Sequence, residues 1–309
     1  MISLDQPRLR YTAHLRPALG STFQPTSFPD VGAARFSRAG GGDSLLVESV
    51  QSMANRLEAT TWDRAERKPV TLVEALPYVR VHRGSNPEEY LTSSRQEAHR
   101  LASAFVRDSA LDGQPMLEVI RDRLGLVKDT PLDYPRMARA ILGLDPFCLL
   151  HGVFFSHRSW LGQPRFTRAI SAVIEAHDVR EVISGGRKAD HVRHQLVEGE
   201  GGTSEGYGSI PFHRVEWTAG DITAMFVVDV DLLRSYGLGA GTTELLALLA
   251  LWEIRTLLAR GLRLRTACDL EVTEHPKDLP EQAELEARIG ELVTAESIGM
   301  EPITVLWKG

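Results

Sequence analysis

The sequence predicts an α+β protein in which helices cover one face of a sheet. Strand, helix and strand patterns occur at both ends of the chain, and a segment of mainly helical pattern separates them. The chain has 309 residues, of which 43% are hydrophobic and 25% are charged, so it is long enough to bury a sizeable core. This composition excludes disordered and fibrous proteins.

The N-terminal part is predicted to hold a strand, a long loop and a helix. Apolar residues alternate with mostly basic residues over residues 8–16, which predicts a strand with one apolar and one basic face. Glycine, proline, serine and threonine dominate residues 17–42, which therefore read as a loop. Apolar residues then recur at helical spacing over residues 46–57, and this predicts an amphipathic helix capped by Asp43 or Ser44.

The middle of the chain is predicted to be mostly helical. Residues 94–97 match a capping box, and proline–glycine pairs predict helices over residues 115–125 and 135–143. An apolar run predicts a strand over residues 147–156. Helical spacing of apolar residues predicts a further helix over residues 166–177.

The last third is predicted to hold three strands and two helices after a glycine-rich segment. Residues 199–208 show no apolar periodicity and read as a mobile loop or hairpin tip. A helix over residues 243–260 is apolar nearly all round, so we expect it at the centre of the core. The other elements are strands at residues 222–230, 262–272 and 303–307 and a helix at residues 281–295.

The net charge of −6 is unevenly distributed along the chain. Residues 1–100 carry 13 basic and 11 acidic side chains, residues 101–200 carry 13 of each, and residues 201–309 carry 9 and 17. The acidity therefore lies in the last third, and the N-terminal and central loops remain free to meet phosphates.

The cysteines and the hydropathy pattern favour a cytoplasmic protein with no membrane partner. Cys148 and Cys268 are too few for a disulfide scaffold and lie in apolar stretches, which is typical of a reducing compartment. The N-terminus has no apolar signal core. The most apolar run is far shorter than the roughly 20 residues that span a bilayer.

Two stretches have surroundings that phosphates favour. The basic strand face, the glycine-rich loop and the polar start of the first helix combine cations, flexible backbone and free N–H groups. A solvated helix face beside a surface loop explains the same spacing equally well. In SGGRKADH, Arg187 and Lys188 follow a glycine turn, although a plain turn with solvated charges is the favoured interpretation there.

The sequence lacks the common catalytic and nucleotide-binding motifs. No lysine precedes the serine in AGGGDS, so a Walker motif is absent, and neither GxSxG nor HExxH occurs. The histidines at residues 151, 157, 191 and 194 have no second cysteine pair beside them, so we expect no metal and no cofactor. Phe154 and Phe155 in HGVFFS are expected to pack in the core rather than stack on bases.

Four stretches in order resemble one known family. They are RYTAHLRPALGSTFQPTSFPD, LVESVQSMANRLE, HGVFFS and SGGRKADHV, and they resemble the RAMP-superfamily backbone subunit of type I-G (formerly I-U) CRISPR Cascade effectors. The resemblance covers most of the chain. It implies an RRM-like (ferredoxin-like) palm over residues 1–80 and 146–309, a helical finger insertion over residues 81–145, and a β-hairpin thumb near residues 199–215.

The resemblance also implies a non-catalytic, RNA-binding scaffold. Such a subunit polymerises head to tail along a CRISPR RNA and presents the spacer for pairing with target DNA. The implied partners are the CRISPR RNA, the target DNA strand, further copies of the chain, an RNA-processing or cap subunit, a large subunit and a recruited helicase-nuclease. A head-to-tail filament joins two different surfaces, so the acidic last third is expected to face a more basic region of the next copy.

Residues of these motifs are the candidates for RNA contact. They are Arg16, Ser21 and Gln24 in the first motif, Ser49, Gln51, Ser52, Asn55 and Arg56 in the second, His157 and Arg158 after the third, and Arg187 and Lys188 in the fourth. Two alternatives remain open. One is a metal-dependent RAMP endoribonuclease that cuts target RNA with a loop aspartate such as Asp30 or Asp43, and the other is a compact small-molecule enzyme with an unrecognised site.

Overall fold

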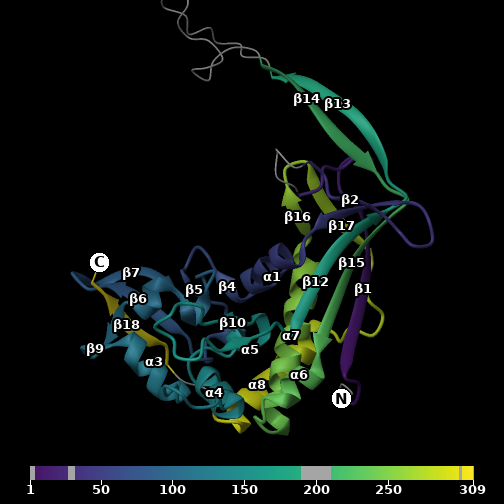
Figure 1. The fold of residues 1–309 in the computed structure, drawn as a ribbon. Coiled ribbons are helices and arrows are strands. Elements are labelled where there is room, and N and C mark those ends of the chain that lie inside the picture. The colour runs from purple at the N-terminus through teal and green to yellow at the C-terminus, as the bar shows by residue number, and fades with distance from the viewer. Residues whose placement is uncertain (1–3, 27–31, 189–209, 299–300, 309) are drawn as a thin grey trace, which may run out of the picture.

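The chain folds into a large antiparallel sheet covered by helices, with a smaller sheet beside it (Figure 1). A computed structural model describes residues 4–26, 32–188, 210–298 and 301–308. The prediction of a mixed helix and sheet protein is confirmed. Among the described residues, no helix combines the length and the apolar character that crossing a bilayer requires.

The large sheet has seven strands in the order β16-β17-β1-β15-β12-β3-β2. They are β1 (Arg8–Pro17), β2 (Arg35–Ser37), β3 (Asp43–Glu48), β12 (Ile170–His177), β15 (Asp221–Asp229), β16 (Leu262–Arg265) and β17 (Cys268–Glu274). In β1 the residues Leu9, Tyr11, Ala13 and Leu15 are buried and their neighbours are more exposed, as the period of two predicts. The strand therefore presents an apolar face to the core and a largely basic face to solvent.

Helices cover the apolar face of this sheet. α1 (Val50–Glu58) packs on β12, and α7 (Ala240–Arg260) packs on β15, α1, α6 (Val230–Ser235) and α8 (Gln282–Ala295). α7 is buried over nearly its whole length and ends at Gly261, where φ is +79°. The predicted central helix is confirmed.

The smaller sheet corrects the prediction of a mostly helical middle. Its strands are β6 (Val79–Arg83), β7 (Asn86–Ser93), β8 (Ser109–Leu111), β9 (Gln114–Pro115) and β18 (Ile303–Trp307), in the order β7-β6-β18-β8-β9. The C-terminal strand β18 runs parallel to β6, so the end of the chain returns to the middle segment. Residues 81–145 therefore form a mixed unit rather than a purely helical one.

Helices surround the small sheet as two of the sequence patterns predict. They are α2 (Ala104–Arg107), α3 (Met116–Leu124) and α4 (Tyr134–Leu142). Short elements precede them in the chain, namely η1 (Ala59–Thr61), β4 (Trp62–Asp63), β5 (Lys68–Pro69), η2 (Thr71–Val73) and η3 (Arg100–Ala102). Gly125 ends α3 at φ +69°. The prediction of a capping box at residues 94–97 is wrong, because the Ser94 hydroxyl donates a hydrogen bond to buried Asp145 instead of capping a helix.

Residues 147–177 have the opposite secondary structure to the one predicted. The predicted strand is instead the helix α5 (Phe147–His151), followed by the two-residue strand β10 (Val153–Phe154), which pairs with β11 (Arg165–Phe166). All five residues of α5 are buried, so the sequence lacks the alternation of polar and apolar residues that identifies an amphipathic helix. The predicted helix is β12, in which burial alternates strictly along the strand.

The start of the predicted first helix is also corrected. β3 continues to Glu48, and Ser49 caps α1, accepting a hydrogen bond from the Ser52 backbone N–H at 3.3 Å. Ser44 lies inside β3, where its hydroxyl bonds His177 at 3.1 Å. The loop predicted over residues 17–42 contains the short strand β2, and the strand predicted over residues 262–272 is the hairpin of β16 and β17.

A two-stranded hairpin projects from the body of the protein (Figure 1). It consists of β13 (Arg180–Lys188) and β14 (Ile210–Thr218), which pair with each other over their full lengths. The predicted loop at residues 199–208 lies outside the described residues. Of the predicted thumb at residues 199–215, only the part from residue 210 onward is described, and it belongs to β14.

Candidate nucleic-acid interface

A buried carboxylate organises the region where α1 begins. Glu48 is 1% exposed and ends β3. Its Oε1 accepts hydrogen bonds from the Thr26 hydroxyl at 2.8 Å and from the Ser49 backbone N–H at 3.2 Å, and its Oε2 accepts from the Arg56 Nε at 2.9 Å. This one side chain therefore fixes the loop after β1, the cap of α1 and the last turn of the helix.

Arg56 is anchored within the protein, and its side chain remains 26% exposed. Besides its bond to Glu48, its other two nitrogens donate to the backbone carbonyls of Arg263 at 3.2 Å and Leu264 at 3.0 Å. All three of its nitrogen atoms thus have protein acceptors. This geometry holds β16 against α1, and the RNA contact expected from the sequence stays a prediction.

The other α1 candidates present polar groups at the surface. Gln51 and Asn55 are exposed and Ser52 is half-buried, whereas Met53 and Leu57 on the opposite side are buried in the core. The period of the helix places these polar side chains on the outward face beside the helix start. This is the part of the predicted site that the structure brings together.

The loop after β1 is clamped beside this helix. Phe23 is 1% exposed and exchanges two backbone hydrogen bonds with Trp217, at 2.9 and 2.8 Å. The Gln24 backbone N–H donates to the Ala267 carbonyl at 2.7 Å, in the turn between β16 and β17. Gln24 is therefore held between the projecting hairpin and that turn, and Ser21 is exposed just before it.

Two arginines of β16 were not among the sequence candidates. Arg263 and Arg265 are exposed, and within the described part of the chain neither forms an ion pair, although Asp269 lies opposite Arg263 in the ladder. Arg265 donates to the Pro25 carbonyl at 3.2 Å, which places it at the clamped loop. The alternation of leucine and arginine in Leu262–Arg265 predicts that both arginines are exposed. Their position beside α1 cannot be predicted from the sequence, because it depends on how the chain folds.

The remaining candidates lie elsewhere. Arg16 is exposed and forms an ion pair with Glu271 of β17. His157 and Arg158 are exposed in the loop after β10, where His157 Nδ1 accepts a hydrogen bond from the Ser159 backbone N–H at 3.2 Å. Arg187 and Lys188 lie at the far end of β13, where their backbones pair with Pro211 and Ile210.

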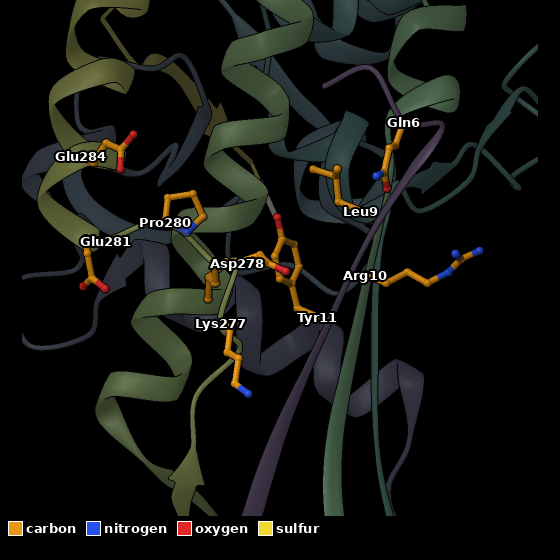
Figure 2. A pocket seen from close by; sticks show the side chains of 10 residues that line it. Gln6, Leu9, Arg10, Tyr11, Lys277, Asp278, Pro280, Glu281 and Glu284 are labelled. Atoms are coloured by element: carbon orange, nitrogen blue, oxygen red, sulfur yellow. The ribbon is translucent and has the colours of Figure 1, made fainter. Parts of the chain in front are cut away.

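A second surface, beside the first half of β1, is acidic. A pocket of about 630 Å³ is lined there by Arg10, Tyr11, Lys277 and three carboxylates, those of Asp278, Glu281 and Glu284 (Figure 2). Burial and Asp278 raise the pKa of Tyr11. The carboxylates outnumber the cations, so this pocket does not suit a phosphate.

The last residue of α1 is coupled to an internal arginine. Glu58 accepts from Arg100 through both carboxylate oxygens, at 2.6 and 2.8 Å. Burial alone would raise the pKa of Glu58, but the positive charges of His151 and Arg100 outweigh it and hold this pKa below the ordinary value of 4.5.

Replacing Glu58 with glutamine is expected to change how stability depends on pH. Because the pKa is lower in the folded state, the ionised carboxylate contributes stability that is fully present above pH 4.5 and is lost as the pH falls through the folded-state pKa. The advantage of the wild type over the Glu58→Gln variant should therefore shrink in acid. Urea unfolding midpoints of both proteins from neutral to acidic pH measure this, and a constant difference would contradict it.

Groups that would support catalysis are scarce in the described chain. No three His, Cys, Asp or Glu side chains gather there in a way that could hold a metal ion. Of the loop aspartates, Asp30 lies outside the described residues and Asp43 is hydrogen-bonded to Arg35, which lowers its pKa. Burial raises the pKa of Cys268 to about 12 and that of Cys148 well above its ordinary value, which makes both poor nucleophiles.

Comparison with solved structures finds 51 similar chains. A chain of a "CRISPR RNA-guided surveillance complex, pre-nicking" is 13% identical with a TM-score of 0.43, and the match covers 93% of this chain and 87% of that one. Csc2 of Thermofilum pendens is 12% identical with a TM-score of 0.33, over 94% of this chain and 77% of that one. Similarities of this size carry no argument about fold or function.

Sequence comparison is more informative. No curated protein matches the chain. The profile of the family described as "CRISPR-associated protein GSU0053" matches residues 9–181, which is more than half of the chain and includes β1, α1 and the HGVFFS stretch. The chain therefore belongs to the CRISPR-associated GSU0053 family.

Proposed function

We propose that this protein is a non-catalytic RAMP backbone subunit that polymerises head to tail along a CRISPR RNA in the cytoplasm. The observation that carries the proposal is the surface where the polar face of α1 meets Arg263 and Arg265. These arginines have no ion pairs among the described residues, and the short polar side chains beside them bond phosphate and sugar oxygens without reading sequence. Membership of a CRISPR-associated family supports the same partner.

The proposed parts of the subunit follow the architecture. The seven-stranded sheet with α1 and α7 is the RRM-like palm, the mixed unit around the small sheet is the fingers, and the hairpin of β13 and β14 is the thumb. An isolated two-stranded hairpin is marginally stable in water, so the thumb is expected to gain order from RNA or from a neighbouring copy. Exposed Ile183 and Phe212 support such a contact.

The proposed assembly also uses the acidic surface. The carboxylates of Asp278, Glu281 and Glu284, which come from the acidic last third, make this pocket unfavourable for phosphates, so it is assigned to contacts with protein. In a head-to-tail filament it faces a more basic surface of the next copy. An RNA-processing or cap subunit, a large subunit and a recruited helicase-nuclease complete the proposed effector, which presents the spacer to target DNA.

The experiment is electron microscopy of the purified protein with its copurified nucleic acid, before and after RNase treatment. The proposal expects an absorbance excess at nucleic-acid wavelengths and a filament that falls apart on digestion. Purified protein that carries no RNA and binds no RNA at low salt would contradict the proposal. Labelled RNA that is cut in Mg²⁺ or Mn²⁺ would instead favour the metal-dependent endoribonuclease.

A further inference from the structure

A second pocket, separate from the start of α1, is lined by basic side chains and by no acidic one. It has a volume of about 430 Å³ and lies between η3, β10, β11 and the start of β12. Its titratable lining consists of His99, Arg100, His151, Arg165 and Arg168. A pocket with this lining attracts anions.

The positive charge of this pocket is incompletely balanced by the protein. Arg100 is paired with Glu58, but Arg165 and Arg168 form no ion pair within the described part of the chain. The Arg168 Nε is buried and has no hydrogen-bond partner there. Burial and the neighbouring charge of Arg100 lower the pKa of Arg168, and the carboxylate of Glu58 only partly opposes them.

A buried histidine adds a further unused polar atom. His151 is 1% exposed, and its Nε2 lies 3.0 Å from both carboxylate oxygens of Glu253. A carboxylate only accepts hydrogen bonds, so the proton of this contact belongs to Nε2. Nδ1 has no partner among the described residues, although a buried polar atom normally has one.

An exposed aromatic ring forms part of the same pocket. Phe154 is 47% exposed, whereas the next residue, Phe155, is fully buried. The sequence predicts core packing for both rings, and this is wrong for Phe154. The Arg165 guanidinium lies 5.7 Å from the centre of the Phe154 ring and so supports it from one side.

We infer that this pocket is a nucleotide subsite, in which Arg165 and Arg168 bind a phosphate of single-stranded RNA and Phe154 stacks with the adjacent base. The inference rests on the proposed function, because it takes the bound RNA as the source of the nucleotide. Phosphate binding beside an aromatic ring is the usual combination in proteins that hold single strands without reading sequence.

A neighbouring pocket lies between this subsite and α1. It has a volume of about 250 Å³ and is lined by Asn55 and Glu58 of α1 and by Ala98. Ala98 also lines the basic pocket. The two pockets therefore adjoin at Ala98, which places the subsite near the exposed face of α1.

The test compares single variants for binding to a short fluorescein-labelled oligouridine by anisotropy. Phe154→Ala is expected to weaken binding about tenfold, because a stacked base is lost. Arg168→Gln is expected to weaken it similarly and to lower the slope of log affinity against log salt by about 0.7. Arg123→Gln, which removes an exposed arginine of α3 outside the pocket, is the matched control and should bind as the wild type does.

A crosslinking experiment on the wild type keeps the inference testable should a variant misfold. Oligouridine containing 4-thiouridine is irradiated with the protein, and the peptide that holds Phe154 should carry the crosslink. Unchanged affinity in both variants, or wild-type RNA binding without that crosslink, would overturn the subsite alone. Failure of the wild type to bind RNA overturns the proposed function instead, and tight Arg168-dependent binding of free uridine monophosphate contradicts RNA as the source.

Discussion

Replacing Asp145 with alanine is expected to lower the free energy of unfolding by about 3–5 kcal/mol, the cost of breaking a buried ion pair. Asp145 and Arg95 have side chains that are 1% and 2% exposed, and the Arg95 Nε lies 2.9 Å from Oδ1. The variant leaves the Arg95 charge buried without its partner. Chemical denaturation of both proteins measures the difference.

Several contacts make Asp145 hard to replace. Its carboxylate also accepts from the Ser94 hydroxyl at 2.5 Å and from the Phe147 backbone N–H at 3.1 Å, so it helps to begin α5. Burial raises its pKa, and Arg95 and Ser94 oppose that rise. The Arg95 guanidinium in turn lies 3.9 Å from the centre of the Phe147 ring. The pair thus joins the segment after β7 to α5.

Asp129→Asn is the matched control for this prediction, because Asn tolerates the left-handed backbone that Asp129 adopts at φ +59°. Its side chain is 85% exposed and reaches Lys128 only at 4.0 Å. A substitution at such a position is expected to change stability by less than about 0.5 kcal/mol. If the Asp145→Ala variant unfolded at the same denaturant concentration as this control, the pair would be stabilising nothing.

Sequence patterns predicted β1 correctly and failed for the short buried helix α5 and for the strand β12. β1 was predicted because its basic residues mark the open face of the sheet. α5 shows no such contrast, since all five of its residues are buried. In β12, Ile170 and Ile174 lie four residues apart, a spacing that fits a helix face and also one face of a strand. Only the pairing with β15 and β3 decides between them.

Only the part of the candidate site that depends on local spacing was predicted from the sequence. The polar face of α1 can be read from local spacing, but the use of Arg56 depends on carbonyls of β16, more than 200 residues away in the chain. The ladder also decides which basic strand residues are neutralised. It sets Glu271 opposite Arg16, where an ion pair forms, and leaves Arg263 and Arg265 without one among the described residues.

The double variant Arg263→Ala, Arg265→Ala is expected to weaken RNA binding about a hundredfold at low salt. Each arginine is assigned one phosphate contact, and a hydrogen bond to a charged group contributes about 1.5 kcal/mol at the lower end of its range. Losing two phosphate contacts with a single strand should also lower the slope of log affinity against log salt by about 1.4. Anisotropy titrations over a series of salt concentrations measure both quantities.

The control for this prediction is Arg123→Ala with Arg139→Ala, which removes two exposed arginines from α3 and α4. It changes the net charge by the same amount as the β16 variant, so an effect of overall charge would appear equally in both. A loss confined to the β16 variant, with a reduced slope, places phosphates beside α1. Equal losses of affinity in the two variants would mean that RNA binding depends on the total charge of the protein. That result would contradict the assignment of the surface beside α1 as the RNA interface.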